Sequence, residues 1–195
     1  MLFRSTPSDL YLADRRSCLM DFTLTSSQVR WRDEGTSFGR TWSAGAPAPA
    51  VIAAAGAKGL LDPSASEIER VLYLETVSAE SVPVGMALAL HGACQSSLDG
   101  RPAAAALREG SVVGALALSS DALPEVQGDR LSGPVRWVMP ATPGGRALVG
   151  AQTGQGFEAC LLSLDAPGVT AQTVATVGLP GLSAVHLECR DVLVE

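Results

Sequence analysis

The chain has 195 residues, of which 17% are charged and 47% hydrophobic, and its formal net charge at pH 7 is −6. This acidic balance, with Lys58 as the one lysine, argues against a nucleic acid or an anionic membrane surface as partner, because both are bound through clustered Lys and Arg. The charged fraction is below the average of about 25%, which leaves apolar material for the surface and favours an oligomer.

The cysteines and the hydropathy pattern exclude several further classes. Cys18, Cys94, Cys160 and Cys189 lie far apart without a CxxC pair, and with two histidines in the chain we expect reduced thiols and no metal site. The first twenty residues lack the apolar run of a signal peptide, and no later stretch has the roughly 18 uninterrupted apolar residues of a membrane span. We therefore expect a cytoplasmic protein.

The first ordered element is predicted to follow a flexible N-terminal extension over residues 1–20. Thr25 and Gln28 have the spacing of a capping box, which predicts a helix start. Helical spacing then places four residues on one face that we expect in the core: Trp31, Gly35, Phe38 and Trp42. Gly and Pro within residues 43–47 should end this helix.

More helices are expected up to residue 108. We predict a short helix over 49–58, a third that begins at Ser64 with Glu67 completing a capping box, and a last one over 102–108. After Pro83, residues 84–94 are small and apolar on every side, as in a fully buried helix. Within it, His91 has no carboxylate at helical spacing, so we interpret it as a core histidine.

From residue 109 the pattern becomes that of strands separated by Gly-rich turns. Runs that favour strands occupy 112–118, 131–139, 147–151, 159–164, 169–175 and 184–194. The Gly-Gly and Gly-Gln-Gly segments at 144–145 and 154–156 open no helix, so they are interpreted as turns, not phosphate loops. In the last strand apolar and polar residues alternate, which puts His186 on the solvent face. The expected fold is α+β: a helical domain over 21–108 and a small antiparallel β-barrel or sandwich over 109–195.

Four segments resemble one family, the acyl-CoA dehydrogenases. The opening MDFTLTSSQVRWRD of residues 20–33 is similar to the start of the family's first helix, and AAAGAKGLL of 53–61 to the end of its second. GDRLSGPVRWV of 128–138 resembles a hairpin of the middle β-domain. The strongest match is VGLPGLSAVHLECRDVLV of 177–194, which resembles the segment that closes that domain.

The resemblance implies a flavoprotein that binds FAD and an acyl thioester. In the family, two segments of the β-domain hold the isoalloxazine ring, and by resemblance these positions are Leu118 and Ser119, and Trp137 and Val138. Hydride transfer to the flavin accompanies removal of the α-proton by a carboxylate. That base lies in the family's C-terminal helical bundle, which would begin after Glu195, so the chain is expected to lack its own base and to need a partner, in a homo- or hetero-oligomer.

Three departures from the family pattern leave other functions open. The loop after Leu118 is several residues short, Met139 replaces a threonine that contacts the flavin, and the loop over 62–66 is shortened. Besides a flavoenzyme subunit, the chain could be a repurposed flavin-independent cyclase or isomerase of a bulky acyl or polyketide-like substrate. It could also be a non-catalytic subunit. The structural alternative for Trp137 is a core side chain. For Ser119 and Ser120 it is a role in a turn.

Overall fold

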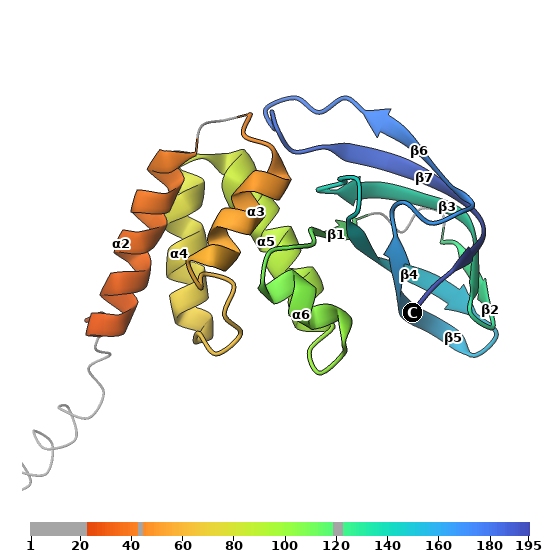
Figure 1. Cartoon of the computed structure of the whole chain (residues 1–195), viewed down its shortest axis with the longest axis horizontal. Helices are drawn as coiled ribbons and strands as arrows, with labels where there is room; N and C mark the ends of the chain where they lie inside the picture. Colours follow the sequence, from red (N-terminus) through yellow and green to blue (C-terminus); the bar gives the residue numbers. More distant parts are fainter. Residues whose placement is uncertain (1–22, 43–44, 119–122) are drawn as a thin grey trace, which may run out of the picture.

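The computed structural model of the protein describes residues 23–42, 45–118 and 123–195 (Figure 1). The expected extension over 1–20, Cys18, Ser119 and Ser120 lie outside the described residues. The described part begins with the helices α2 (Ser26–Thr41), α3 (Ala48–Ala57), α4 (Glu67–Glu80), α5 (Val82–Ser97) and α6 (Ala103–Arg108). The strands follow: β1 (Gly114–Ala117), β2 (Glu125–Gln127), β3 (Arg130–Met139), β4 (Arg146–Thr153), β5 (Gly156–Ser163), β6 (Val169–Val174) and β7 (Ala184–Leu193).

The capping box of α2 is confirmed, whereas the one predicted for α4 lies two residues later than expected. The Thr25 amide donates to Gln28 Oε1 at 2.8 Å. In α4 the box is formed by Ser66 and Glu69, and the Ser66 amide donates to Glu69 Oε2 at 2.8 Å. Ser64 is not the cap because its own amide donates to Asp62 Oδ1 at 2.8 Å, which forms a turn before the helix.

Helix α2 packs closely on α4 along the predicted apolar face. Phe38 is buried, and the ring of Trp31 meets that of Tyr73 edge-on at a centroid distance of 5.9 Å. At Gly35 a methyl group would lie 2.7 Å from the carbonyl oxygen of Tyr73, so the absence of a side chain permits the close approach of the two helices.

Helix α5 is the central helix of the molecule and contacts α3, α4, α6 and β1. Pro83 is in its first turn, where a proline lacks no hydrogen bond that the helix needs. The prediction that the helix is buried on every side is wrong for Ala89 and Ala93, which are exposed. Its other faces contribute the core residues Val84, Ala87, Leu88, His91 and Cys94.

The strands form one curved sheet in the order β6-β7-β3-(β1, β2)-β4-β5. β1 and β2 share one position in the sheet, between β3 and β4. Both are antiparallel to β3 and parallel to β4. The C-terminal residues return to β5, where Glu195 and Leu161 exchange two backbone hydrogen bonds of 2.9 and 3.0 Å. The sheet is therefore curved and mixed: besides the expected antiparallel pairings it has two parallel pairings that the sequence did not indicate and a strand, β2, that it did not predict.

Two apolar clusters join the helices to the sheet, which lie side by side in Figure 1. One contains Ala48, Ala87, Met139, Leu182 and Ala184. The other contains Cys94, Leu98, Ala104, Leu107 and Leu161. Because both α5 and the sheet contribute to each cluster, the position of β3 relative to the helices is set by packing.

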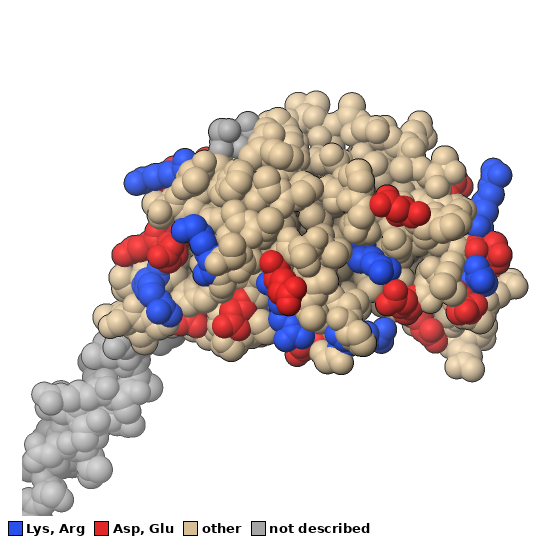
Figure 2. Space-filling view, viewed as in Figure 1, with Lys and Arg blue, Asp and Glu red and all other residues tan. Residues whose placement is uncertain are grey.

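Charged side chains of both signs are interspersed on the face shown in Figure 2, while the upper part of this view, beside β6 and β7, is uncharged. In the described ranges no helix combines the length and apolar character that crossing a membrane would require.

Candidate functional site on β3

Trp137 lies at an irregularity where β3 pairs with β7. Val135 is opposite Leu187 and Val138 is opposite Val185, so Arg136 and Trp137 together face the single residue His186. This is a β-bulge, a feature that redirects side chains at functional edges. Trp137 has a φ of 54°, a left-handed conformation that is rare for a bulky residue. Its side chain is 40% exposed, so it is not a core tryptophan.

Both backbone groups of Trp137 are held by neighbours on other strands. Its amide donates to His186 Nδ1 at 3.2 Å, and its carbonyl accepts from the amide of Leu118 at 3.1 Å. The rings of Trp137 and His186 also meet edge-on, with a centroid distance of 5.3 Å and an interplanar angle of 88°. The strained conformation is therefore fixed by β1 on one side and β7 on the other.

His186 is a neighbour of Trp137 that the sequence did not identify. The ring is partly exposed, in agreement with its expected place on the solvent face, but it also accepts the Trp137 amide, a contact that the sequence did not indicate. Alternation along β7 correctly put His186 and Val185 on opposite faces, but it gives no information on the partner strand. The bulge in β3 shifts the register, so the pairing could not be counted from the sequence.

Of the other predicted flavin contacts, Leu118 is exposed and Val138 is buried. Leu118 follows β1, is 48% exposed and is joined to Trp137 by the hydrogen bond described above. Val138 is fully buried in the sheet core, so a ligand at the Trp137 surface cannot touch its side chain. Ser119, the fourth predicted residue, is outside the described residues.

Met139, which replaces the family's threonine, is also buried. Its side chain is 5% exposed and belongs to the cluster that joins the helices to the sheet. At this position the side chain therefore contributes to packing and not to the surface beside Trp137.

The chemistry available beside Trp137 is aromatic and polar. Arg136 and Glu188 form an ion pair of 3.0 Å on the neighbouring positions of the two strands. Over the described ranges, no three His, Cys, Asp or Glu side chains are grouped so that they could hold a metal ion. The arrangement suits a planar, π-rich ligand better than a metal.

His91, the other histidine, has a structural role at the junction between helices and sheet. Its Nδ1 accepts the amide of Gly114 at 2.9 Å, so Nε2 carries the proton that is donated to the carbonyl of Leu107 at 3.0 Å. Burial lowers the pKa of His91 to about 4, the main cause being the loss of hydration of the charged ring. The ring is therefore neutral at physiological pH, in agreement with its interpretation as a core histidine.

No protein-family model and no curated protein matches the sequence, whereas many solved structures share its fold. Glutaryl-CoA dehydrogenase from Mycobacterium smegmatis is similar with a TM-score of 0.75 at 18% identity, over 88% of this chain and 54% of that one. Butyryl-CoA dehydrogenase from Megasphaera elsdenii has the same TM-score and identity, over 90% of this chain and 58% of that one. The FAD complex of PigA reaches 0.74 at 17% identity, over 90% and 58%.

The chain thus spans little more than half the length of these structures. At such low identity the likeness establishes the fold. The resemblance found in the sequence is confirmed at this level: the chain has the fold of the N-terminal helical and middle β-domains of acyl-CoA dehydrogenases.

Proposed function

We propose that the chain, with a helical domain over 21–108 and a β-domain over 109–195, forms the part of an acyl-CoA dehydrogenase-like flavoprotein that holds the flavin ring of FAD against Trp137. The observation that carries the proposal is the conformation of this residue: a tryptophan in the left-handed region with a 40% exposed side chain. Such strain persists only when surrounding contacts enforce it, and it is concentrated at functional sites.

The Trp137 surface has the properties that a flavin wall requires. An exposed aromatic ring can stack beside the isoalloxazine and exclude water from one face. Leu118, 48% exposed and one hydrogen bond away, adds an apolar contact. Ser119 follows it directly and is proposed to donate a hydrogen bond to the ring edge. Val138 would contribute through its backbone, since its side chain is buried.

FAD binding is further supported by the fold neighbours, among them PigA as its FAD complex and a glutaryl-CoA dehydrogenase in complex with FADH2. The flavin would accept a hydride from the acyl chain. The substrate is proposed to be an acyl thioester, in line with the glutaryl-CoA and butyryl-CoA dehydrogenases.

The base that removes the α-proton is proposed to come from a further segment or partner that completes the site. Beside Trp137, the ring of His186 already accepts the Trp137 amide and Glu188 is paired with Arg136. Proton abstraction requires a base within hydrogen-bond reach of the substrate, which a helical bundle packed on this surface would supply.

Oligomer formation is proposed through the uncharged surface beside β6 and β7. Residues 171–187 contain no Asp, Glu, Lys or Arg, and the side chain of Val177 in this stretch is fully exposed. An exposed segment without charge is typical of an interaction surface.

A redox-neutral cyclase or isomerase is the second candidate, favoured by Met139. Because its side chain packs in the helix–sheet cluster, the hydroxyl that the family offers to the flavin at this position is replaced by an apolar group turned inwards. Such an enzyme would bind an acyl ligand without flavin. A non-catalytic binding or structural subunit, the third candidate, would catalyse no reaction.

The test compares FAD binding by the wild-type chain with binding by Trp137→Ala and by Phe157→Ala, a control that removes another exposed aromatic ring, on β5. Equilibrium dialysis with flavin absorbance at about 450 nm measures the bound fraction. We expect saturable binding that Trp137→Ala weakens at least tenfold and Phe157→Ala leaves unchanged. Absence of saturable binding, or equal effects of the two substitutions, contradicts the proposal.

A further inference from the structure

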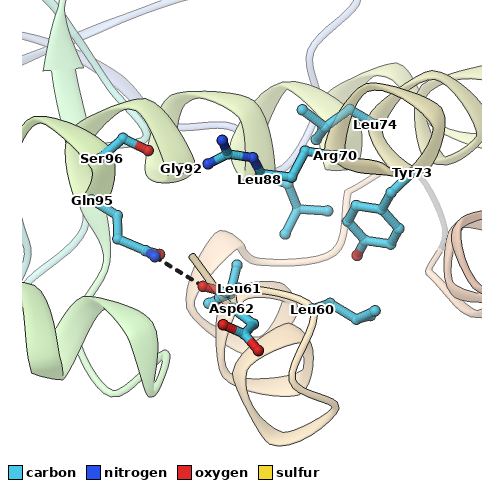
Figure 3. A pocket seen from close by; sticks show the side chains of 10 residues that line it. All are labelled: Leu60, Leu61, Asp62, Arg70, Tyr73, Leu74, Leu88, Gly92, Gln95 and Ser96. Atoms are coloured by element: carbon cyan, nitrogen blue, oxygen red, sulfur yellow. Dashed lines mark hydrogen bonds between the residues drawn. The ribbon is translucent and has the colours of Figure 1, made fainter. Parts of the chain in front are cut away.

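The helical half of the molecule contains a pocket that shares no lining residue with the Trp137 surface. It is bounded by the loop between α3 and α4, by α4 and by α5 (Figure 3). The inner cavity has a volume of about 50 Å³. Its apolar walls are the side chains of Leu60, Leu61, Leu74 and Leu88.

Two buried polar atoms in this pocket have no hydrogen-bond partner among the described residues. They are the hydroxyl oxygen of Tyr73, on α4, and Oε1 of Gln95, on α5. The two side chains are 3% and 6% exposed. Figure 3 shows them on opposite sides of the pocket, with Leu61 and Leu88 between. Native proteins rarely leave such groups unpaired, so a ligand with hydrogen-bonding groups fits here.

Each of these two atoms has one hydrogen-bonding role, as an acceptor or as a donor. Gln95 Nε2 donates to the carbonyl of Leu61 at 2.9 Å, which leaves Oε1 as an unpaired acceptor. Burial raises the pKa of Tyr73 well above its ordinary value, so its hydroxyl keeps its proton and can donate. The pocket therefore offers one acceptor and one donor in leucine-lined surroundings.

Two arginines add positive charge where the pocket opens. An adjoining hollow of about 200 Å³ shares Arg70, Gln95 and Ser96 with the pocket and is also lined by Arg108. In Figure 3 the guanidinium of Arg70 reaches along α5 towards Ser96. Arg70 is half-buried, and within the described ranges it forms neither a salt bridge nor a side-chain hydrogen bond. Among the described residues, the side chain of Arg108 donates to the carbonyl of Ala104, at 3.3 Å.

The acidic side chains at the rims are held by backbone amides. Asp62 Oδ1 accepts the Ser64 amide at 2.8 Å, and Asp99 Oδ1 accepts the Gly100 amide at 3.1 Å. The hydrogen bonds with Ser64 also lower the pKa of Asp62. Neither carboxylate is within ion-pair distance of Arg70 or Arg108, so the guanidinium groups are available to an anion.

We propose that this is a binding site for a small organic anion that carries a hydroxyl group. The carboxylate would be bound by Arg70 and Arg108, to which guanidinium groups offer paired donors. The short apolar body would enter the leucine-lined cavity, and the hydroxyl would bond to Tyr73, on the side of the pocket opposite Gln95. A cavity of about 150 Å³ accommodates benzene, so one of about 50 Å³ admits only a few carbon atoms.

The test is isothermal titration of the full chain with 4-hydroxybutyrate, butyrate, 1-butanol and inorganic phosphate. We expect 4-hydroxybutyrate to bind saturably. Butyrate, which lacks the hydroxyl, should bind about fivefold more weakly. We expect much weaker binding of 1-butanol, which lacks the charge, and of phosphate, which lacks the apolar body. Nuclear magnetic resonance shifts of the Gln95 side-chain amide locate the bound molecule.

Matched variants distinguish this site from a general anion effect. Arg70→Gln should weaken 4-hydroxybutyrate at least tenfold, while Arg40→Gln, which removes an exposed arginine paired with Glu80 at 3.0 Å, should leave it unchanged. Tyr73→Phe keeps the buried ring and should abolish the preference for 4-hydroxybutyrate over butyrate. No saturable binding, equally tight binding of phosphate, or binding that is indifferent to Arg70→Gln overturns the proposal.

Discussion

The backbone amide of Trp137 donates to Nδ1 of His186 at 3.2 Å, while the two rings meet edge-on at 5.3 Å between centroids. One histidine thus holds both the backbone and the ring of a residue whose φ is 54°. Because a left-handed tryptophan would relax without such restraints, we expect His186, together with the amide of Leu118, to set the direction in which the exposed indole points.

Replacement of His186 should therefore affect Trp137 specifically. We expect His186→Ala to lower the free energy of unfolding by about 1 kcal/mol, as the Trp137 amide loses its acceptor. The indole N–H resonance of Trp137, assigned by its loss in Trp137→Phe, should shift. Arg190→Ala, an exposed change on the same strand, is the control. An unchanged indole resonance in His186→Ala would refute the positioning role.

The strain at Trp137 can be measured by two substitutions that remove the same ring. Glycine adopts positive φ freely, whereas alanine is penalised by about 1–2 kcal/mol. Trp137→Gly should therefore be more stable than Trp137→Ala by about 1 kcal/mol in urea unfolding, although glycine costs more chain entropy. If alanine is the more stable replacement, the backbone is not held as described.

His91 should make stability depend on pH in an identifiable window. Its folded pKa of about 4 lies below the ordinary value, so the unfolded chain binds the proton first. This contribution is fully present above pH ~6.5 and is lost as the pH falls towards the folded pKa, at about 1.4 kcal/mol per pH unit and roughly 3 kcal/mol in total. His91→Gln should remove this slope, whereas His186→Ala should retain it. Equal slopes for wild type and His91→Gln would count against a neutral, buried His91.

Two glycine-to-alanine changes in helices should have opposite effects. In Gly35→Ala the new methyl group would lie 2.7 Å from the Tyr73 carbonyl oxygen, so α2 must move away from α4 at a cost of about 1–3 kcal/mol. In Gly92→Ala on α5 the methyl group meets no atom within 4 Å. It should raise stability by up to about 1 kcal/mol through helix propensity. Equal effects in urea unfolding would contradict the close packing of α2 on α4.

Thiol reactivity tests the burial of the cysteines. Cys94, Cys160 and Cys189 are free and buried, and burial raises the pKa of Cys94 and Cys189 to about 11. A thiol reagent at mildly alkaline pH should therefore modify at most one of the four cysteines in the native chain, and all four after unfolding. Rapid modification of two or more in the native protein would show that the cores open.

Much of the fold could be predicted because local patterns and tertiary packing agree. Thr25 and Gln28 form the predicted capping box, and Phe38 is in the core with Trp31 and Trp42 packed against it. At the start of α4 two serines compete, and the sequence could not show that Asp62 would engage the amide of Ser64 and leave Ser66 as the cap.

The candidate site was only partly predictable because it depends on strand register. Leu118 and Trp137 are brought together as expected, through one backbone hydrogen bond. The role of His186 and the inward direction of Val138 depend on the bulge in β3, which adds one residue on one strand only. β2 is three residues long, too short for a period of two to be recognised.

We expect the exposed face of Trp137 to form a wall of a flavin site, and a titration of the ¹⁵N-labelled chain with riboflavin is the measurement that bears on this surface alone. Riboflavin carries the isoalloxazine without the adenosine phosphate, so it reports on this surface even where other contacts to FAD are missing. We expect saturable shifts of the Trp137 indole and the Leu118 amide. The Leu118 shift should be lost in Trp137→Ala, and both shifts should be unchanged in Phe157→Ala. Shifts that are absent from these two residues, or that persist in Trp137→Ala, would contradict it.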